Sequence, residues 1–433
     1  MGANIAKSAK LEKLVGTYHE EGPRGVARRL RDKSLELAFP HLGPKFIRFK
    51  YKPGTPLITD VLLADPELAA PVVAEPRSPG QPLTIAWVIP PVGPGGGGHT
   101  TISRVAKQLI ADGHKVTFTI YDNSSRQLNS ESVTGLRDFY GLDVDMLELH
   151  ELDTADAVIA TSWETAYAVN KVGINPATGL APHKFYFVQD FEPSFYGIGT
   201  EYVLAEQTYR FGFYGVTAGP WLTMRVNEYG MEAEPFQFGV DLDIYRLDPE
   251  HAPQRKKQVI FYARPTTERR GFELGLMALT LFHEAHPEYE IITFGQDMSK
   301  FELPFPARNL GVITEHQLAD LYQESVACLL LSLTNVSLLP LELLAAGCVP
   351  VMNDGENNRM VLGETPGILY SGVMPTSLAR KLNEAVENPD IESNALAISG
   401  AVQGRSWEAG LKQAARIIER RTTGQPPASE MEI

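Results

Sequence analysis

The sequence predicts an α/β protein with two Rossmann-like domains, and three observations lead to that prediction. Short apolar segments typical of buried strands alternate with helical patterns from residue 83 onward. The alternation stops over residues 241–253, which are polar and contain prolines, and then starts again. The length of 433 residues also favours two domains over one. Ligands of open parallel sheets bind beyond the carboxyl ends of the strands, so two facing domains would place a site in the cleft between them.

Residues 1–82 are predicted to lie outside both domains, as a basic N-terminal arm followed by a proline-rich linker over 53–82. Lys and Arg outnumber Asp and Glu in residues 1–52, whereas the whole chain has a net charge of −14. The basic stretch suits contact with an anionic membrane surface, and a solvated arm or helical hairpin lying on the acidic remainder is the alternative. An acidic remainder argues against a nucleic-acid partner.

The compartment is predicted from segments that the sequence lacks. The first residues have neither an apolar core nor a cleavage pattern, and no apolar run approaches the roughly 20 residues that span a bilayer. We therefore expect a cytoplasmic protein, with peripheral contact at the inner face of the membrane as an option for the basic arm. Cys328 and Cys348 lie in apolar segments and are expected to be buried free thiols.

The first domain, predicted over 83–245, opens with a glycine-rich turn. Gly95 to Gly98 and His99 separate the predicted strand 83–89 from a helix expected to start near Thr101. Backbone N–H groups at a helix N-terminus favour a phosphate or a hydroxylated ligand, and glycines let that ligand approach. A flexible turn with spare glycines is the alternative. Further strands are predicted at 115–121, 157–160, 184–188 and 215–218.

The second domain, predicted over 246–405, contains strands at 258–263, 290–294, 326–331 and 349–352. Arg264, Arg269 and Arg270 follow the first of these strands and precede a helix. Guanidinium groups beside a helix N-terminus suit a diphosphate, because arginine binds oxyanions through two N–H groups. Glu342 stands in the first turn of an otherwise apolar helix, where complementarity to the helix dipole is the alternative to ligand binding. A helix over 407–421 and a polar tail complete the last segment, 406–433.

At these motifs the chain resembles glycosyltransferase family 4. The resemblance rests on Gly239-Val240-Asp241, then Arg264 with Arg270-Gly271, then the stretch from Pro340 and Glu342 through Gly347 to Pro350. Segments 184–193, 202–210 and 217–222 resemble more closely bacterial cell-surface rhamnosyltransferases of the WsaF type, which act on S-layer and related rhamnan glycans from dTDP-β-L-rhamnose. The resemblance implies a GT-B fold, with two facing Rossmann-like domains and a C-terminal helix that crosses back. It also implies a nucleotide-sugar donor with no further cofactor and no metal.

The resemblance also implies roles for individual residues. Arg264 and Arg270 would hold the donor diphosphate, and Glu342 would accept a hydrogen bond from hydroxyls of the nucleotide sugar. The remaining donor-binding positions would be Val312 and Ile313 beside the base, Gly97 and Gly98 beside the sugar and diphosphate, and Thr334 beside the sugar. Family 4 enzymes usually carry a second Glu at the position of Thr334, eight residues before Glu342. Its replacement suits a less polar sugar edge, as in a 6-deoxy sugar.

Two mechanisms follow from this reading. In a retaining front-face reaction the leaving diphosphate accepts the acceptor proton, so no protein base is required; the family resemblance favours this route. An inverting reaction needs a carboxylate or histidine near the acceptor, and the catalytic candidates are Asp190, Glu192 and His99. Asp190 follows the strand 184–188 and is expected to face the cleft, with a capping role as the alternative. Nearby aromatic residues suit either a platform for the acceptor or the strand core: Tyr186, Phe187, Phe191, Phe195 and Tyr196.

The predicted function is transfer of a sugar, L-rhamnose from dTDP-β-L-rhamnose, onto a cell-surface glycan or a lipid-linked glycan precursor. Transfer from a UDP- or GDP-linked sugar is the first alternative. A homologue that binds such ligands without turnover is the second, although the arginines and Glu342 argue against it. A related epimerase or phosphorylase is the third, and no lysine suited to pyridoxal phosphate stands out for a phosphorylase.

Overall fold

The computed structural model describes residues 58–65, 72–93, 96–121, 130–247 and 255–426. The chain divides into two compact units, residues 1–69 and 70–433. The described part of the first unit forms helix α3 (Ile58–Leu63). This helix lies within residues 53–82, whose assignment as a linker stays a prediction. The basic stretch 1–52 lies outside the described residues, as does 427–433 of the predicted tail.

The second unit begins with a parallel sheet of seven strands among the described residues, in the order β3-β2-β1-β4-β5-β6-β7. Apolar residues cover both faces of its central strands, which is why these strands are nearly continuous hydrophobic runs in the sequence. The five predicted strands are confirmed to within one residue, and the short edge strands β3 and β7 were not predicted. The bounds are β1 (Thr84–Ile89), β2 (Lys115–Ile120), β3 (Asp145–Met146), β4 (Ala157–Ala160), β5 (His183–Val188), β6 (Tyr214–Ala218) and β7 (Ala233–Phe236).

Helices connect these strands, as parallel pairing requires. Helix α6 starts with a capping box, in which the Ser162 hydroxyl accepts from the backbone N–H of Thr165 and the Thr165 side chain accepts in return. Helix α8 starts with Pro220, whose fixed φ suits a first helical position. The connecting helices are α4 (Gly97–Ala111), α5 (Ser130–Tyr140), α6 (Trp163–Asn170), α7 (Thr200–Gln207) and α8 (Pro220–Asn227), with 3-10 turns η1 (Leu149–Thr154), η2 (Glu192–Phe195) and η3 (Thr208–Arg210).

A second parallel sheet follows, with six strands among the described residues in the order β10-β9-β8-β11-β12-β13. The four predicted strands are confirmed to within one residue, and the short strands β10 and β13 were not predicted. The strands are β8 (Gln258–Tyr262), β9 (Glu290–Phe294), β10 (Ala307–Asn309), β11 (Ala327–Leu330), β12 (Val349–Asn353) and β13 (Leu369–Ser371). The helices are α9 (Phe272–Ala285), α10 (Glu315–Glu324), α11 (Leu339–Ala345), α12 (Glu356–Leu362), α13 (Pro375–Val386) and α14 (Ile391–Gly400), with the 3-10 turn η5 (Glu268–Arg270).

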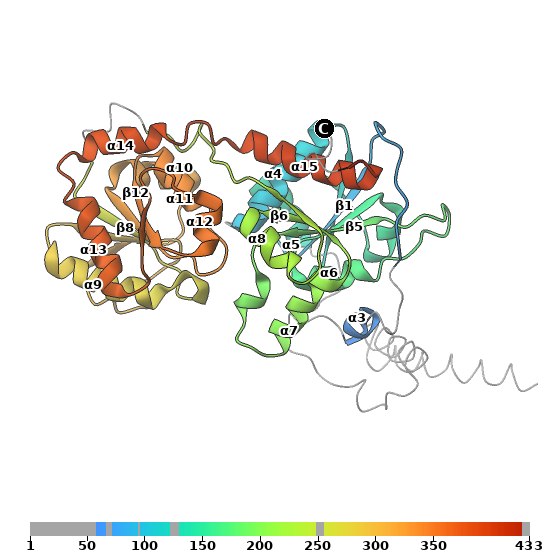
Figure 1. The fold of residues 1–433 in the computed structure, drawn as a ribbon, viewed down its shortest axis with the longest axis horizontal. Helices are drawn as coiled ribbons and strands as arrows, with labels where there is room; N and C mark the ends of the chain where they lie inside the picture. The colour runs from blue at the N-terminus through green and yellow to red at the C-terminus, as the bar shows by residue number, and fades with distance from the viewer. Residues whose placement is uncertain (1–57, 66–71, 94–95, 122–129, 248–254, 427–433) are drawn as a thin grey trace, which may run out of the picture. The chain divides into compact units, whose positions relative to one another are not determined.

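The last helix, α15 (Trp407–Thr423), belongs to the core of the first sheet although it follows the second sheet in sequence. Ile417 and Ile418 are buried there, and α15 packs beside α4 (Figure 1). The chain therefore crosses between the two sheets twice, and Val240 in the first crossing bridges Ser406 in the second. The α/β class with two parallel sheets is confirmed. The boundaries at 245/246 and 405/406 stay predictions.

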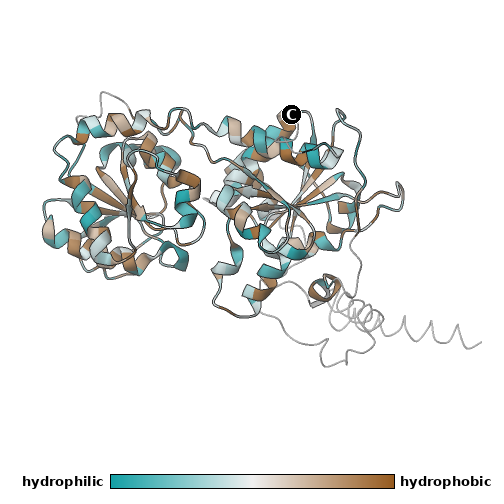
Figure 2. Cartoon of the chain, viewed as in Figure 1, coloured by the Kyte–Doolittle hydropathy of each residue, from teal (hydrophilic) through white to brown (hydrophobic). Residues whose placement is uncertain are grey.

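Hydropathy follows this architecture, since apolar residues are concentrated along the strands of both sheets (Figure 2). Cys328 in β11 and Cys348 just before β12 are buried free thiols, as predicted. Among the described residues, no helix has both the length and the apolar character that a membrane span requires.

Candidate active site

Each sheet has one point where neighbouring strands send their connections in opposite directions. In the first sheet it lies between β1 and β4, and in the second between β8 and β11. Ligands of doubly wound sheets bind outside the carboxyl ends of the strands at such points. The glycine-rich turn follows β1, the arginines follow β8, and the loop 332–338 follows β11. The motifs singled out in the sequence therefore lie where the topology favours a ligand.

Three arginines mark the end of β8. Gly271 adopts φ 55°, and a Cβ there would lie 2.8 Å from Leu331 Cδ1, so this turn requires glycine for both reasons. Arg270 Nη1 donates to Ser332 Oγ at 2.6 Å, and Arg264 Nη1 donates to Tyr262 Oη at 3.3 Å. Burial lowers the pKa of Arg270, and the charges of Arg269 and Arg264 lower it further, against the opposing effect of Asp190. A bound anion would relieve this crowding of positive charge.

Polar atoms without partners gather beside these arginines. Thr334 and Asn335 are 5% and 1% exposed, yet Thr334 Oγ1 and Asn335 Oδ1 have no hydrogen-bond partner. The same holds for Ser337 Oγ in this loop and for the buried Nε of Arg264. Buried polar atoms are normally hydrogen-bonded, so four unpaired ones point to a polar ligand. A hydroxylated, anionic molecule offers acceptors for the guanidinium and both donors and acceptors for the loop.

Asparagines from the neighbouring strand and helix fix the start of this loop. Asn353 accepts from the backbone N–H of Ser332 at 2.8 Å and donates back to its carbonyl at 3.0 Å. Asn357 and Asn358 donate to the same carbonyl at 2.9 and 3.3 Å, and Asn357 also donates to the carbonyl of Thr334. The loop with the unpaired atoms is thus held rigidly from one side.

Glu342 projects from the first turn of α11. Burial raises the pKa of its carboxyl to about 8, with Arg104 opposing the shift and Glu315 and Asp241 adding to it. The carboxyl is consequently protonated at neutral pH, and it offers one O–H donor as well as acceptor oxygens. That state suits the hydroxyls of a sugar or a ribose.

The two residues predicted beside the base follow β10. The Val312 side chain is 75% exposed, whereas Ile313 packs partly against the second core. An exposed valine on a short loop leaves an apolar surface for a flat ring. The assignment to a base stays a prediction.

The glycine-rich turn differs from its prediction in one respect. Helix α4 starts at Gly97, so the expected start near Thr101 is wrong by about one turn, and Gly97, Gly98 and His99 belong to the helix. A Cβ on Gly97 would meet nothing within 4 Å, and one on Gly98 would lie 3.4 Å from Gln189 Nε2. The N-terminus of α4 has no side-chain cap and faces open space at Gly97.

His99 is tied to its own turn. Its Nε2 lies 3.4 Å from the carbonyl of Pro90, and its ring centroid lies 5.9 Å from that of Tyr140. Burial lowers the pKa of His99, with the contact to Pro90 opposing the shift. The imidazole is therefore neutral at neutral pH.

Asp190 lies at the carboxyl end of β5, as predicted, and uses both carboxylate oxygens. Oδ1 accepts from the backbone N–H groups of Phe191 and Asn335, each at 2.9 Å. Oδ2 accepts from Arg269 Nε at 3.1 Å. Asn335 and Arg269 both belong to the second sheet's loops, so this carboxylate connects the two halves of the second unit.

Glu192 lies deeper than the sequence suggests. Its Oε2 accepts from the backbone N–H of Trp163, the first residue of α6, at 2.7 Å. Burial raises the pKa of this carboxyl well above its ordinary value, and the charge of Glu164 raises it further. In this position Glu192 caps a helix inside the fold. Its predicted catalytic role stays a prediction.

The predicted aromatic residues fall into two groups. Tyr186, Phe187 and Phe191 are buried in the core. Phe195 and Tyr196 are half-buried: Arg269 Cζ lies 3.9 Å from the Phe195 ring centroid, and Tyr196 Oη accepts from Trp163 Nε1 at 3.0 Å. The surface beside Arg269 therefore includes an aromatic ring.

Sequence reasoning missed the role of Asn335 and the partner of Arg269. Asn335 lies 145 residues from Asp190 in sequence, and Arg269 lies 79 residues from it. No local pattern links such positions. The neighbouring glycine and arginine motifs predicted a ligand site near Arg269, but they gave no indication of its contact with Asp190.

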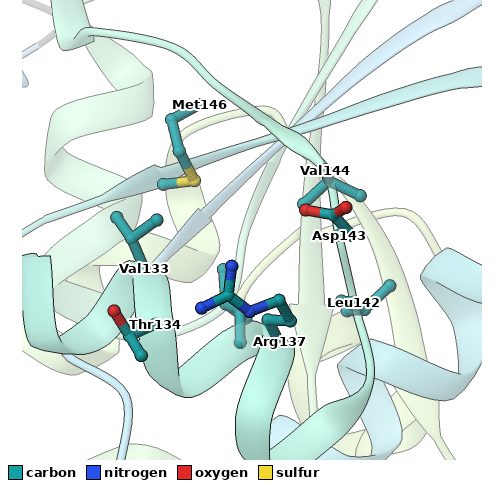
Figure 3. A pocket seen from close by; sticks show the side chains of 8 residues that line it. Val133, Thr134, Arg137, Leu142, Asp143, Val144 and Met146 are labelled. Carbon is teal, nitrogen blue, oxygen red and sulfur yellow. The ribbon is translucent and has the colours of Figure 1, made fainter.

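A separate recess lies at the edge of the first sheet (Figure 3). It holds about 70 Å³ and is lined by Val133, Thr134, Leu136, Arg137, Leu142, Asp143, Val144 and Met146. No candidate site residue lines it. Across the described ranges, no three His, Cys, Asp or Glu side chains gather as a metal site would require.

Comparison with known proteins agrees with this arrangement. Residues 145–217 match the family model described as WsaF, N-terminal domain, and residues 257–383 match that of WsaF, C-terminal domain. An O-antigen biosynthesis protein, RfbC from Myxococcus xanthus, is 34% identical over 383 residues, which are 84% of this chain and 29% of the relative. The chain thus spans less than a third of that relative's length.

Solved structures share the fold at low sequence identity. Sucrose-phosphate synthase from Thermosynechococcus elongatus has a TM-score of 0.60 at 11% identity, covering 79% of this chain and 100% of that one. Anabaena HepE in complex with UDP and glucose has a TM-score of 0.57 at 12% identity, covering 79% and 100%. WaaG, a glycosyltransferase involved in lipopolysaccharide biosynthesis, has a TM-score of 0.56 at 14% identity, covering 77% and 99%. The chain has the GT-B fold, and two of its segments match the models of the N-terminal and C-terminal domains of WsaF in that order.

Proposed function

We propose that this protein is a glycosyltransferase that moves L-rhamnose from dTDP-β-L-rhamnose onto a cell-surface glycan or a lipid-linked glycan precursor. The observation that carries the proposal is the cluster of buried, partnerless polar atoms beside Arg264 and Arg270. A nucleoside diphosphate sugar supplies phosphate oxygens for the arginines and sugar hydroxyls for Thr334 and Ser337. The name of the Myxococcus relative, which refers to O-antigen biosynthesis, supports a glycan product.

The leaving nucleoside diphosphate would be stabilised by this chain's own groups. In this proposal Arg264 and Arg270 bind the diphosphate and offset the negative charge that develops as the sugar–phosphate bond breaks. Preorganised charge is the largest catalytic contribution in many enzymes. No metal and no further cofactor are part of the proposal. In the retaining front-face reaction, a phosphate oxygen of the leaving group takes the acceptor proton as the new glycosidic bond forms.

The donor sugar is proposed from the environment of Thr334. A hydroxyl replaces the carboxylate that family 4 enzymes usually carry there, so the sugar subsite has a neutral group in place of a charged acceptor. A 6-deoxy sugar lacks a hydroxyl at carbon 6 and suits that subsite. UDP- and GDP-linked sugars, and binding without turnover, remain the alternatives.

Thermal unfolding with a panel of dTDP, UDP, GDP and their sugar conjugates tests the proposal. A ligand that binds only the native state adds about 2.7 kcal/mol at a concentration 100 times its Kd. We expect dTDP and dTDP-rhamnose to raise Tm, and Arg270→Ala to abolish the shift. Arg308→Ala is the matched control, because Arg308 pairs with Glu290 on the exposed surface of the same domain.

The outcomes separate the alternatives. A Tm shift only with UDP or GDP forms would replace the donor while keeping a glycosyltransferase. Binding of dTDP-rhamnose without release of dTDP, in the presence of bacterial lipid-linked glycans, would favour a binding protein. No shift with any nucleotide would contradict the proposal. The proposed membrane contact of residues 1–52 is tested separately. Deletion of residues 1–52 should abolish binding to anionic vesicles, and unchanged binding would contradict it.

A further inference from the structure

Asn335 connects the loops of the two sheets through three hydrogen bonds. Its backbone N–H donates to Asp190 Oδ1 at 2.9 Å, and its Nδ2 donates to the carbonyls of Gln189 at 2.9 Å and Ala218 at 3.3 Å. Asn335 is 1% exposed. It sits between Thr334 and Ser337, whose hydroxyls are unpaired. The first sheet therefore holds the middle of the loop that presents those hydroxyls.

Asp190 also holds Arg269. The guanidinium donates to Oδ2 from Nε and lies flat enough on Phe195 to place Cζ 3.9 Å from the ring centroid. Both partners of Arg269, Asp190 and Phe195, follow β5. Because Arg269 precedes Arg270 in the same turn, fixing its side chain restrains the turn that carries the diphosphate candidate.

The surroundings of Asp190 favour this use of its carboxylate. Arg269 and Arg270 are the positive charges near the Asp190 carboxylate. Glu192 and Tyr209 are the other titratable groups whose pKa the charge of Asp190 affects. Three N–H donors occupy the two oxygens. These donors fill most of the roughly four lone-pair sites of the carboxylate, as expected of a group that positions its neighbours.

We propose that Asp190 is a positioning residue, which acts through Asn335 and Arg269 to hold the donor-binding loop and arginine turn in their ligand-ready arrangement. This rests on the proposed function and deepens it, because it assigns a residue of the first domain to donor binding in the second. Asp190 then contributes to nucleotide affinity without touching the nucleotide. The contacts of Asp190 and donor binding stabilise each other, since each orders the same loop.

Two substitutions separate positioning from base catalysis. Asp190→Asn keeps one oxygen that can accept from Asn335 and Phe191, but it removes the negative charge that pairs with Arg269. Asp190→Ala removes all three contacts. Positioning predicts a rise in nucleotide Kd of about tenfold for Asn and about a hundredfold for Ala, of the size expected for charge-assisted hydrogen bonds. A general base predicts an unchanged Kd in both variants and an equal loss of turnover of about 10²–10⁴-fold.

Asp156 provides a matched control in the same sheet. Its oxygens accept from Arg77 Nε at 2.8 Å and the backbone N–H of Thr84 at 2.9 Å, just before β4 rather than beyond a strand's carboxyl end. Asp156→Ala should lower Tm and leave the nucleotide Kd unchanged. A merely structural role for Asp190 would give that same pattern, and it would overturn the proposal.

These Kd values are measured by calorimetry. The ligand is the nucleoside diphosphate, among dTDP, UDP and GDP, that the wild-type chain binds. Asn335→Ala should also raise Kd, and the double variant with Asp190→Ala should raise it by less than the product of the two single effects, because the residues share one contact. If the Kd of the double variant rises by the full product of the two single effects, or if Asp190→Ala leaves Kd unchanged, positioning is rejected while the donor site stands. Failure of the wild-type chain to bind any of the three would reject both proposals.

Discussion

A Cβ atom on Gly239 would lie 2.4 Å from the backbone nitrogen of Trp407, so the two crossings between the domains touch backbone to backbone. Gly410 repeats the contact from the other side, since its Cβ would lie 2.0 Å from the carbonyl oxygen of Gln237. The backbone N–H of Val240 donates to the carbonyl of Arg405 at 2.8 Å within the same junction. Glycine is required at both positions by close approach, with no positive φ involved.

Gly239→Ala should therefore destabilise the protein by about 1–3 kcal/mol, the usual cost of overpacking a rigid contact. Urea unfolding measures the change in the free energy of unfolding. Gly173→Ala is the control, because a Cβ there would meet nothing within 4 Å, and its effect should stay within about 0.5 kcal/mol. Equal effects in the two variants would contradict the close contact.

Glu342 should make stability fall as pH rises. Its carboxyl has a pKa of about 8 in the folded chain and an ordinary value of 4.5. Between these values the unfolded chain has released the proton and the folded chain retains it, so the free energy of unfolding decreases with pH, by up to about 1.4 kcal/mol per unit.

Glu342→Gln removes this titration while keeping shape and hydrogen bonding. The variant should gain stability relative to wild type progressively from pH 5 to pH 8, as measured by urea unfolding at each pH. The control is Glu268→Gln, at an exposed position of the arginine turn. Parallel curves for Glu342→Gln itself would show that the carboxyl is ionised in the folded chain.

Asn353→Ala should weaken both stability and nucleotide binding. The side chain exchanges two hydrogen bonds with the Ser332 backbone. Its loss leaves the buried N–H of Ser332 without a partner and removes one donor to the Ser332 carbonyl. The expected cost is about 1–3 kcal/mol. The loop would then present Thr334 and Ser337 less rigidly. Calorimetry with the nucleotide that the wild-type protein binds should show a raised Kd for the variant. A lowered Tm with an unchanged Kd would show that Asn353 supports folding but not nucleotide binding by the loop.

Ile418→Ala should destabilise the first sheet selectively. Ile418 is fully buried in the core of that sheet, where truncation of an isoleucine costs about 2–5 kcal/mol. Hydrogen exchange should show faster exchange in β1 and β5 than in β8 and β11. Leu382→Ala, at a fully buried position of α13 in the second core, should give the reverse pattern.

The central strands could be predicted because their signal is local. Segments such as 157–160 and 290–294 are apolar, short and bounded by polar residues, and they form β4 and β9 at those positions. The edge strands lack that signal: β3 has two residues, and β7 contains Pro235, which weakens the strand tendency of so short a segment. The start of α4 was missed because consecutive glycines favour a turn in isolation, whereas here they begin a helix that the first core supports.

The arginines, the glycine-rich turn and Glu342 could likewise be found from local motifs. Their neighbours could not, because the contacts of Asp190 depend on how two domains meet. Nothing around Asn335 in the sequence distinguishes it from other loop asparagines. Likewise, Glu192 resembles an exposed residue before a proline, and only the fold brings the N-terminus of α6 to its carboxylate.

The place of α15 in the first core has a consequence for synthesis on the ribosome. The first sheet is complete in sequence by Phe236, but the helix that covers part of it is translated only after the whole second domain. The second domain can bury its core as soon as α14 has emerged, while the earlier-made sheet still exposes apolar surface. The nascent first domain must therefore wait for Ile417 and Ile418, and during that interval it is the half of the second unit exposed to chaperones and to aggregation.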